Sequence, residues 1–224
     1  RSYYTNTNYY YEITGWGDTI YGATNGGLIT YDNENKHFDV LTNTNGLPIN
    51  SQSCVGLDSS RFVWVGNSSG LALVDSTFTT VHVYPAECLT CTKTQEIVCR
   101  KDSVYVGSSA GLLFIDTKGT PDDFTDDERI RIFEANGLPS GNIQSIAVDD
   151  SLVWVGTSGG LVRFAKDFTL PVQYDESNGL LSNVINKVAI INSVVYVGTD
   201  LGLQSLQGDH FDTLFEQAMW CAGR

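Results

Sequence analysis

Short apolar runs separated by polar turns are the main pattern of this chain. Residues 142–148 form one such run, and the polar turn Asp149-Asp150-Ser151 separates it from the run 152–155. A glycine-rich turn follows, and then come the runs 161–165 and 172–174. Because these runs are short and dense in β-branched and aromatic residues, they predict four β-strands joined by tight turns.

The same four-strand unit recurs along the chain, and its glycine-rich turn marks each copy. The copies read VWVGTSGGL (153–161), VWVGNSSGL (63–71), VYVGSSAGL (104–112), VYVGTDLGL (195–203) and, more loosely and with one extra residue in its turn, IYGATNGGL (20–28). Their anchor glycines recur at intervals of about 41 to 49 residues, which is typical of propeller blades. These anchors are Gly22, Gly66, Gly107, Gly156 and Gly198.

The sequence therefore predicts an all-β fold, a β-propeller of five four-stranded blades, over residues 1–215. The predicted repeats are 1–42, 43–84, 85–133, 134–174 and 175–215, followed by a tail, 216–224. The motifs HFDVL (37–41) and HFDTL (210–214) occupy matching places, so the last blade needs no strand from the other terminus. We expect either a five-bladed ring without such a latch or five blades of a larger ring.

A second motif lies in the links between repeats. It reads NGLP at 45–48 and 136–139 and NGL at 178–180, while the third repeat has Glu87-Cys88-Leu89 in that place. Links and glycine-rich turns are expected on one rim, where propellers usually bind their ligands. Asn45, Asn136 and Asn178 are therefore candidate ligand-binding residues.

The pairing of NGLP with a following VWVGTxxGL resembles the two-component regulator propeller repeat, and the resemblance covers nearly the whole chain. That family is known from periplasmic sensor regions of bacterial hybrid histidine kinases and from secreted bacterial propellers. The resemblance implies the propeller fold and leaves the function open.

Composition narrows the location and the partners. The chain has 224 residues, 42% of them apolar and only 17% charged, and this neutral-polar character is more typical of exported proteins. Its formal net charge of −13 repels nucleic acid and anionic membranes. No apolar run approaches the roughly 20 residues that span a bilayer. We expect an extracellular or periplasmic protein that binds proteins, its own copies or a glycan.

The first strands of the blades are expected to line a central channel. Counting twelve residues back from each anchor glycine gives a mostly amide ring, which suits either a water-filled bore or a sugar-like ligand. Its members are Tyr10, Cys54, Gln95, Gln144 and Asn186.

Candidate catalytic residues are few. Propeller glycosidases need two carboxylates in the channel, and the first strands offer Glu12 and Glu96. No arginine cluster of the sialidase kind is present, and GTSGG (156–160) does not fit a nucleophile elbow. The sequence predicts no enzyme and no cofactor, with a glycan-active enzyme as the least favoured alternative.

An acidic insertion and a cysteine cluster interrupt the third repeat. Residues 116–128 lengthen the loop between its third and fourth strands, and the carboxylates there could hold Ca²⁺ or be solvated. They are Asp122, Asp123, Asp126 and Asp127. The motif Cys88-x-x-Cys91, with Cys99 close behind, lacks the helix of a redox motif and the extra ligands of a zinc site. We expect a local disulfide among these three, with the pairing open.

The aromatic ends and a sequon complete the candidate sites. Tyrosines are enriched at protein interfaces, and the N-terminal ones could either make assembly contacts or pack between blades, as could Trp220 in the tail. These tyrosines are Tyr3, Tyr4, Tyr9, Tyr10 and Tyr11. Asn67-Ser68-Ser69 is a candidate glycosylation site on the glycine-rich rim.

Three functions are consistent with these features. We favour a non-catalytic, secreted binding or assembly module that associates with itself at the cell surface. A ligand-sensing fragment of a periplasmic two-component sensor is the first alternative, and a glycan-active enzyme is the second.

Overall fold

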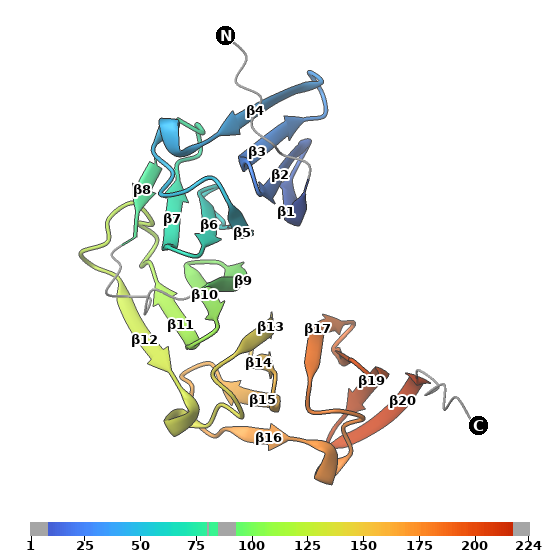
Figure 1. Ribbon diagram of the computed structural model, residues 1–224. Helices are drawn as coiled ribbons and strands as arrows, with labels where there is room; N and C mark the ends of the chain where they lie inside the picture. Colours follow the sequence, from blue (N-terminus) through green and yellow to red (C-terminus); the bar gives the residue numbers. More distant parts are fainter. Residues whose placement is uncertain (1–8, 80, 85–92, 217–224) are drawn as a thin grey trace. The chain divides into compact units, whose positions relative to one another are not determined.

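A computed structural model describes residues 9–79, 81–84 and 93–216, and the chain divides into two compact units at Ile132 and Phe133. The first unit holds three four-stranded sheets and the second holds two (Figure 1). Each sheet is an antiparallel meander of consecutive strands. The predicted all-β fold of five four-stranded propeller blades is confirmed, and the described residues form no α-helix.

Blades 1 to 3 belong to the first unit. Blade 1 comprises β1 (Tyr10–Trp16), β2 (Thr19–Thr24), β3 (Gly27–Asp32) and β4 (His37–Leu41). Blade 2 comprises β5 (Gln52–Leu57), β6 (Val63–Asn67), β7 (Gly70–Val74) and β8 (Val81–Val83). Blade 3 comprises β9 (Thr94–Arg100), β10 (Ser103–Ser108), β11 (Gly111–Asp116) and β12 (Glu128–Ile132), so the acidic insertion lies where the sequence predicts it.

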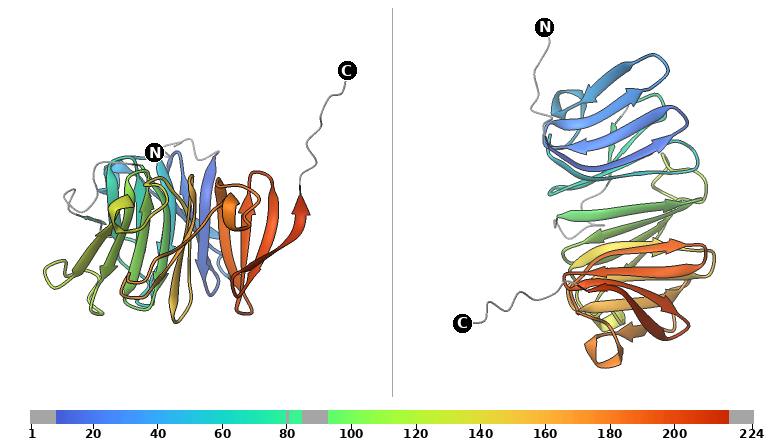
Figure 2. Two further views of the ribbon diagram at one scale, coloured as in Figure 1. Left: turned by 90° about the horizontal axis from the view of Figure 1, so that it is seen from below. Right: turned by 90° about the vertical axis from the view of Figure 1, so that its right-hand side faces the viewer.

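Blades 4 and 5 form the second unit. Blade 4 comprises β13 (Ile143–Val148), β14 (Leu152–Thr157), β15 (Gly160–Ala165) and β16 (Val172–Tyr174). Blade 5 comprises β17 (Ile185–Ile191), β18 (Val194–Thr199), β19 (Gly202–Gln207) and β20 (His210–Glu216), so its outer strand is present as expected. Within each unit, successive blades lie face to face with their first strands adjoining (Figure 2).

Alternation along the second strand creates two different faces on each blade. In blade 2, Val63 and Val65 point toward blade 1, while Trp64 points toward blade 3 and packs with Val104 and Val106. We call the valine side the leading face and the aromatic side the trailing face. Because side chains alternate across a strand, the aromatic residue of blade 2 lies on the side opposite its valine pair and packs on the valine pair of blade 3.

The same packing occurs at the other blade interfaces inside the units. Trp154 of blade 4 packs with Val195 and Val197 of blade 5, and Tyr21 of blade 1 lies against the cluster that contains Val63 and Val65. These valines are at most 6% exposed. Apolar burial of this kind is the dominant stabilising contribution to a repeat fold.

The first repeat requires a corrected alignment. Thr24 pairs with Gly27 as Asn67 pairs with Gly70, so the turn of blade 1 has the ordinary length and contains no extra residue. The anchor position is therefore occupied by Ala23, which pairs with Glu12 as Gly66 pairs with Cys54. Gly22 instead lies on the leading face, where the other blades have a valine.

Short 3₁₀ turns form the links that follow blades 1, 3 and 4. They span Asn43–Asn45, Glu134–Asn136 and Glu176–Asn178, and each is followed by a left-handed glycine, which explains the Asn-Gly pair. The next residue in each motif, Leu47, Leu138 or Leu180, is at most 4% exposed and anchors the link in the apolar core.

Candidate interaction face

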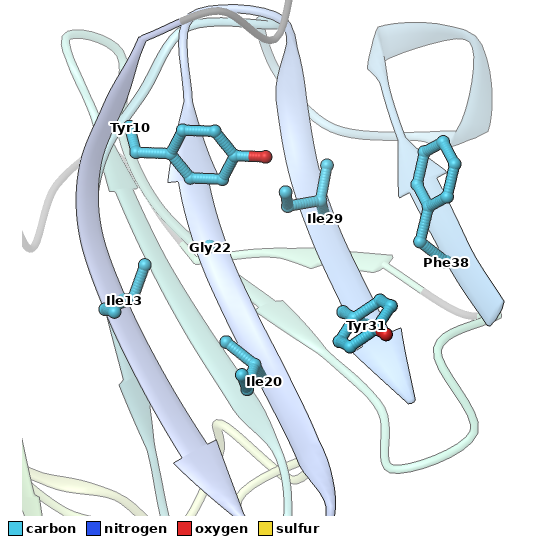
Figure 3. Close-up of a pocket in the computed structure, with 7 residues that line it drawn as sticks. All are labelled: Tyr10, Ile13, Ile20, Gly22, Ile29, Tyr31 and Phe38. Atoms are coloured by element: carbon cyan, nitrogen blue, oxygen red, sulfur yellow. The ribbon is translucent and has the colours of Figure 1, made fainter. Parts of the chain in front are cut away.

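The leading face of blade 1 carries a contiguous group of exposed apolar side chains. It surrounds Gly22 with the side chains of Tyr10, Ile13, Ile20, Ile29, Tyr31 and Phe38 (Figure 3). Four of these side chains are 45–65% exposed, and Ile29 is the most enclosed at 9%. Contiguous apolar exposure of this kind marks an interaction site more often than an isolated exposed residue does.

Strand register places these residues on one side of the sheet. Ile13 pairs with Gly22, which pairs with Ile29, and Ile20 pairs with Tyr31, which pairs with Phe38. Directly paired residues in an antiparallel sheet point to the same face. The surface therefore follows from the alternation of blade 1, and it is the counterpart of the leading faces that are buried in blades 2, 3 and 5.

A hollow lies at the centre of this face. Its volume is about 350 Å³ and only uncharged residues line it. The ring of Tyr10 extends across β2 over Gly22 toward Ile29 (Figure 3). A Cβ on Gly22 would approach the Tyr10 ring to 3.3 Å and Ile29 Cγ1 to 3.1 Å. The absence of a side chain at Gly22 therefore lets the Tyr10 ring lie across β2, where it lines the hollow.

Three tyrosines of this region, Tyr9, Tyr10 and Tyr11, are predicted from the sequence to make assembly contacts. Each is 55–66% exposed, but only Tyr10 lines the hollow. Tyr3, Tyr4 and Trp220 lie outside the described residues. The isoleucines and Phe38 were not predicted from the sequence. The valine pair that recurs in the other repeats was a signal that could have identified this face as apolar.

The first strands contain a second repeated feature, a β-bulge in each blade. The register shifts at Tyr11, Ser53, Gln95, Gln144 and Asn186, in each case one residue before the partner of the anchor position. Bulges re-aim side chains locally. Three of the predicted amides thus occupy equivalent bulges, whereas Tyr10 and Cys54 do not, and the corrected positions are Tyr11 and Ser53.

The residue after the bulge links neighbouring blades at two of the interfaces. Val55 N donates to Glu12 Oε2 at 3.0 Å, and Val188 N donates to Ser145 Oγ at 3.1 Å in the equivalent place. The Glu12 side chain therefore accepts a hydrogen bond from the backbone of blade 2 and links blades 1 and 2. Glu96 is only 7% exposed. Burial raises the pKa of the Cys54 thiol, and the charges of the two candidate catalytic carboxylates raise it further.

The link asparagines each make a bond inside their own turn. Asn45 Oδ1 accepts from Thr42 N at 3.1 Å, Asn136 Oδ1 from Phe133 N at 3.0 Å, and Asn178 Oδ1 from Asp175 N at 2.8 Å. This bond accounts for the recurrence of asparagine without a ligand. The link and the glycine-rich turn lie on one rim in blade 4, as predicted. There Ser140 Oγ in the link lies 3.0 Å from Ser158 Oγ in the turn.

The glycosylation prediction needs correction. Asn67 is fully buried, its Nδ2 donates to Gln52 Oε1 at 3.1 Å, and its Oδ1 accepts from Ser69 N at 2.7 Å. It occupies the turn position where the other blades have threonine or serine. In the folded chain this sequon is therefore not accessible on the rim.

The acidic insertion is bonded to the protein itself. Asp123 Oδ1 accepts from Thr125 N at 3.0 Å, and Asp126 Oδ2 accepts from Thr120 Oγ1 at 2.9 Å, while Asp122 is exposed. Asp127 accepts from Tyr84 Oη of blade 2, and burial raises the pKa of its carboxyl group. Among the described residues, no cluster of acidic, histidine and cysteine side chains suits a metal ion.

Cys99 is a free thiol in the described structure, as is Cys54. The predicted disulfide therefore receives no support at Cys99, while Cys88 and Cys91 lie outside the described residues. Burial is the largest cause of the raised pKa of the Cys99 thiol. A raised pKa suppresses the reactive thiolate.

Comparisons with known proteins support the fold. No protein-family model matches the sequence, and no curated protein matches it either. Among solved structures, the extracellular domain of a protein described as a hybrid two-component system of B. thetaiotaomicron superimposes with a TM-score of 0.72 at 20% identity. That match covers 93% of this chain and 28% of the other.

Two further structures show the same likeness. The extracellular domain of a protein described as a one-component system of B. thetaiotaomicron has a TM-score of 0.69 at 21% identity, covering 87% of this chain and 27% of the other. PorZ, a surface component of the type-IX secretion system of Porphyromonas gingivalis, has a TM-score of 0.70 at 16% identity, covering 92% and 33%. The chain thus spans about a third or less of these relatives, and the likeness concerns the fold.

Proposed function

We propose that this chain is a non-catalytic β-propeller module of an extracellular or periplasmic protein, and that it works by binding protein surfaces, including its own copies. The observation that carries this proposal is the uncovered leading face of blade 1 with its central hollow. Ile13, Ile20 and Phe38 are 65%, 45% and 62% exposed there. Leaving that much apolar surface in water is unfavourable, so its retention favours a contact role.

The proposed location rests on composition and on the likeness of the fold. The chain combines a low charged fraction of 17% with the fold of extracellular domains from two proteins of B. thetaiotaomicron. Within the described part of the chain, no helix has the length and apolar character that membrane spanning requires. Burial of Glu96 and the structural bond of Glu12 favour a non-catalytic role for the first strands.

Photo-crosslinking tests the proposal directly. We would place a photoreactive phenylalanine analogue at Phe38 and, as a matched control, at Leu170, which is 79% exposed on the turn between β15 and β16. Adducts to protein are expected from Phe38 in whole cells and in purified material, and far fewer from Leu170. Equal, background-level adducts at both positions would show that the face binds no protein.

A ligand-sensing role is the second candidate, and the bulge series favours it. Gln95 and Gln144 are partly exposed and Asn186 is exposed, all at equivalent bulges of first strands. Amide side chains can both donate to and accept from a sugar-like ligand. A glycan panel read by thermal shift would test this role. A rise in melting temperature that Gln144→Ala abolishes supports sensing, and no shift with any glycan argues against it.

A further inference from the structure

We infer that a second copy of this chain covers the leading face of blade 1, and that it does so with the trailing face of its own blade 5. This inference rests on the proposed function, because it names the partner of the same face. Three interfaces inside the units, between blades 1 and 2, 2 and 3, and 4 and 5, already use this pairing of faces.

The trailing face of blade 5 has the required chemistry. Tyr196 occupies the place of Trp64 and Trp154, and Leu203 the place of Leu161. Where a following blade covers that place, Trp154 is 3% exposed and Leu161 is fully buried. Tyr196 is only half-buried and Leu203 is 38% exposed. This face therefore has an aromatic residue and a leucine that are more exposed than their counterparts in blade 4.

Other residues extend the same surface. Ile191 is 55% exposed, and Phe215, which pairs with Leu203, is 64% exposed. In blade 4 the residue that pairs with Leu161 is Tyr174, and blade 5 buries it to 4% exposure. The apolar positions of the two trailing faces thus correspond, and they differ in whether a neighbour covers them.

The hollow explains how an aromatic residue could seat on blade 1. In the internal interfaces the aromatic residue packs on two valines, whereas blade 1 offers Ile20 and Gly22 at those positions. The Tyr10 ring covers Gly22, and the hollow that this ring lines together with Ile20 provides the space. In this contact Tyr196 of the second copy lies over Ile20, and its ring packs against the Tyr10 ring.

Such a contact joins two different surfaces, so it is heterologous. Repetition of a heterologous contact gives a closed ring or an open filament of copies, whereas a contact between two identical faces stops at a dimer. Each copy has a formal net charge of −13, which opposes association. Added salt screens that repulsion, and we expect it to strengthen assembly.

Complementation of two variants tests the inference. Ile20→Asp blocks the leading face of blade 1, and Tyr196→Arg blocks the trailing face of blade 5. Sedimentation velocity over a concentration series should show association for the wild type and for Leu170→Asp. Each single variant should associate more weakly by on the order of a hundredfold, because it buries an unpaired charge.

An equimolar mixture of the two variants is the decisive sample. Each variant retains the face that the other has lost, so the mixture should form a dimer that cannot grow further. Phe38→Asp and Leu203→Arg form an independent second pair, and thermal unfolding checks that every variant folds. Success of both mixtures would support the head-to-tail contact.

The failures are distinguishable. If Tyr196→Arg still associated with itself and only Ile20→Asp lost association, the role of blade 5 would be overturned. Self-association through blade 1 would then remain supported. A wild type that stays monomeric throughout the series would overturn the inference. If Phe38 then still formed adducts with a different protein in cells, the proposed function would stand without self-association.

Discussion

The leading faces of blades 1 and 3 have the same architecture and opposite surroundings. In blade 3, Val104 and Val106 are fully buried beneath Trp64 of blade 2. In blade 1 the same positions are Ile20, 45% exposed, and Gly22, which borders the hollow. The comparison shows that the repeat pattern places apolar side chains on the leading face of a blade whether or not another blade lies against it. Where a neighbouring blade covers the face, the apolar residues stabilise the fold, and where none does, they are available for contact with a partner.

The largest expected effect is at the covered face. Trp64 is fully buried, and its Nε1 donates to Asp58 Oδ2 at 3.0 Å. Trp64→Ala should lower the free energy of unfolding by about 3–5 kcal/mol, the range for truncating a large core aromatic. Urea denaturation measures this loss. A cost below about 1 kcal/mol, which is typical of surface changes, would contradict the assignment of this interface as core.

Two anchor glycines of the second unit provide a sharper version of the comparison. A Cβ on Gly156 would lie 2.5 Å from Ile185 Cγ2 of blade 5, whereas on Gly198 the nearest atom is Lys187 O at 3.6 Å. Gly156→Ala should therefore cost about 1–3 kcal/mol through overpacking. Gly198→Ala should be neutral or slightly stabilising, since alanine reduces the entropy of the unfolded chain.

Chemical denaturation of both variants checks this pair. Both variants add the same methyl group, so the difference between their free energies of unfolding measures the effect of the neighbouring blade. Equal destabilisation of the two variants would mean that the strand itself requires glycine at the anchor position. The covering blade would then not be the reason that alanine is disfavoured there.

Acid should weaken the turns by a smaller amount. Bonds from the Ser177 side chain and backbone hold the pKa of Asp175 below its ordinary value. Because the folded-state pKa is lowered, this stabilisation is present above the unfolded-state pKa and is lost as pH falls through the folded-state pKa. Melting temperature should therefore drop more steeply below about pH 4 in the wild type than in Asp175→Asn. Parallel curves would show that the Asp175 bonds add nothing.

The smallest effect on stability is expected at the uncovered face. Phe38→Asp should change the free energy of unfolding by no more than about 0.5 kcal/mol when measured on dilute protein, because the side chain is 62% exposed. The same variant should weaken protein contacts strongly. A large loss of stability in dilute protein would show that the face is part of the core.

Sequence periodicity predicted much of this fold, because each blade repeats one pattern. The positions of β14, β15 and β16 follow from runs of apolar residues with polar turns, and the insertion before β12 follows from the longest repeat interval. The link glycines were recognisable for the same reason, since Gly46 and Gly137 adopt a left-handed conformation that other residues rarely adopt.

The candidate sites were less predictable, because polar residues have several possible roles. Asn67 reads as a sequon, yet it is a buried turn residue bonded to Gln52. Glu12 reads as a catalytic carboxylate, yet it accepts from the backbone of the next blade. A count of residues also misplaced Tyr10, because the anchor of the first repeat is Ala23 and not Gly22, and Cys54, because blade 2 has one more residue between its bulge and its anchor glycine.

The sequence by itself determined the strands, their turns and the alternation that gives every blade a leading face and a trailing face, because these depend on local pairing of adjacent segments. Only the tertiary structure decided which of those sides is covered. Burial depends on whether another blade lies against the face, and Ile20 and Val104 differ in that respect although both occupy the same place in the repeat.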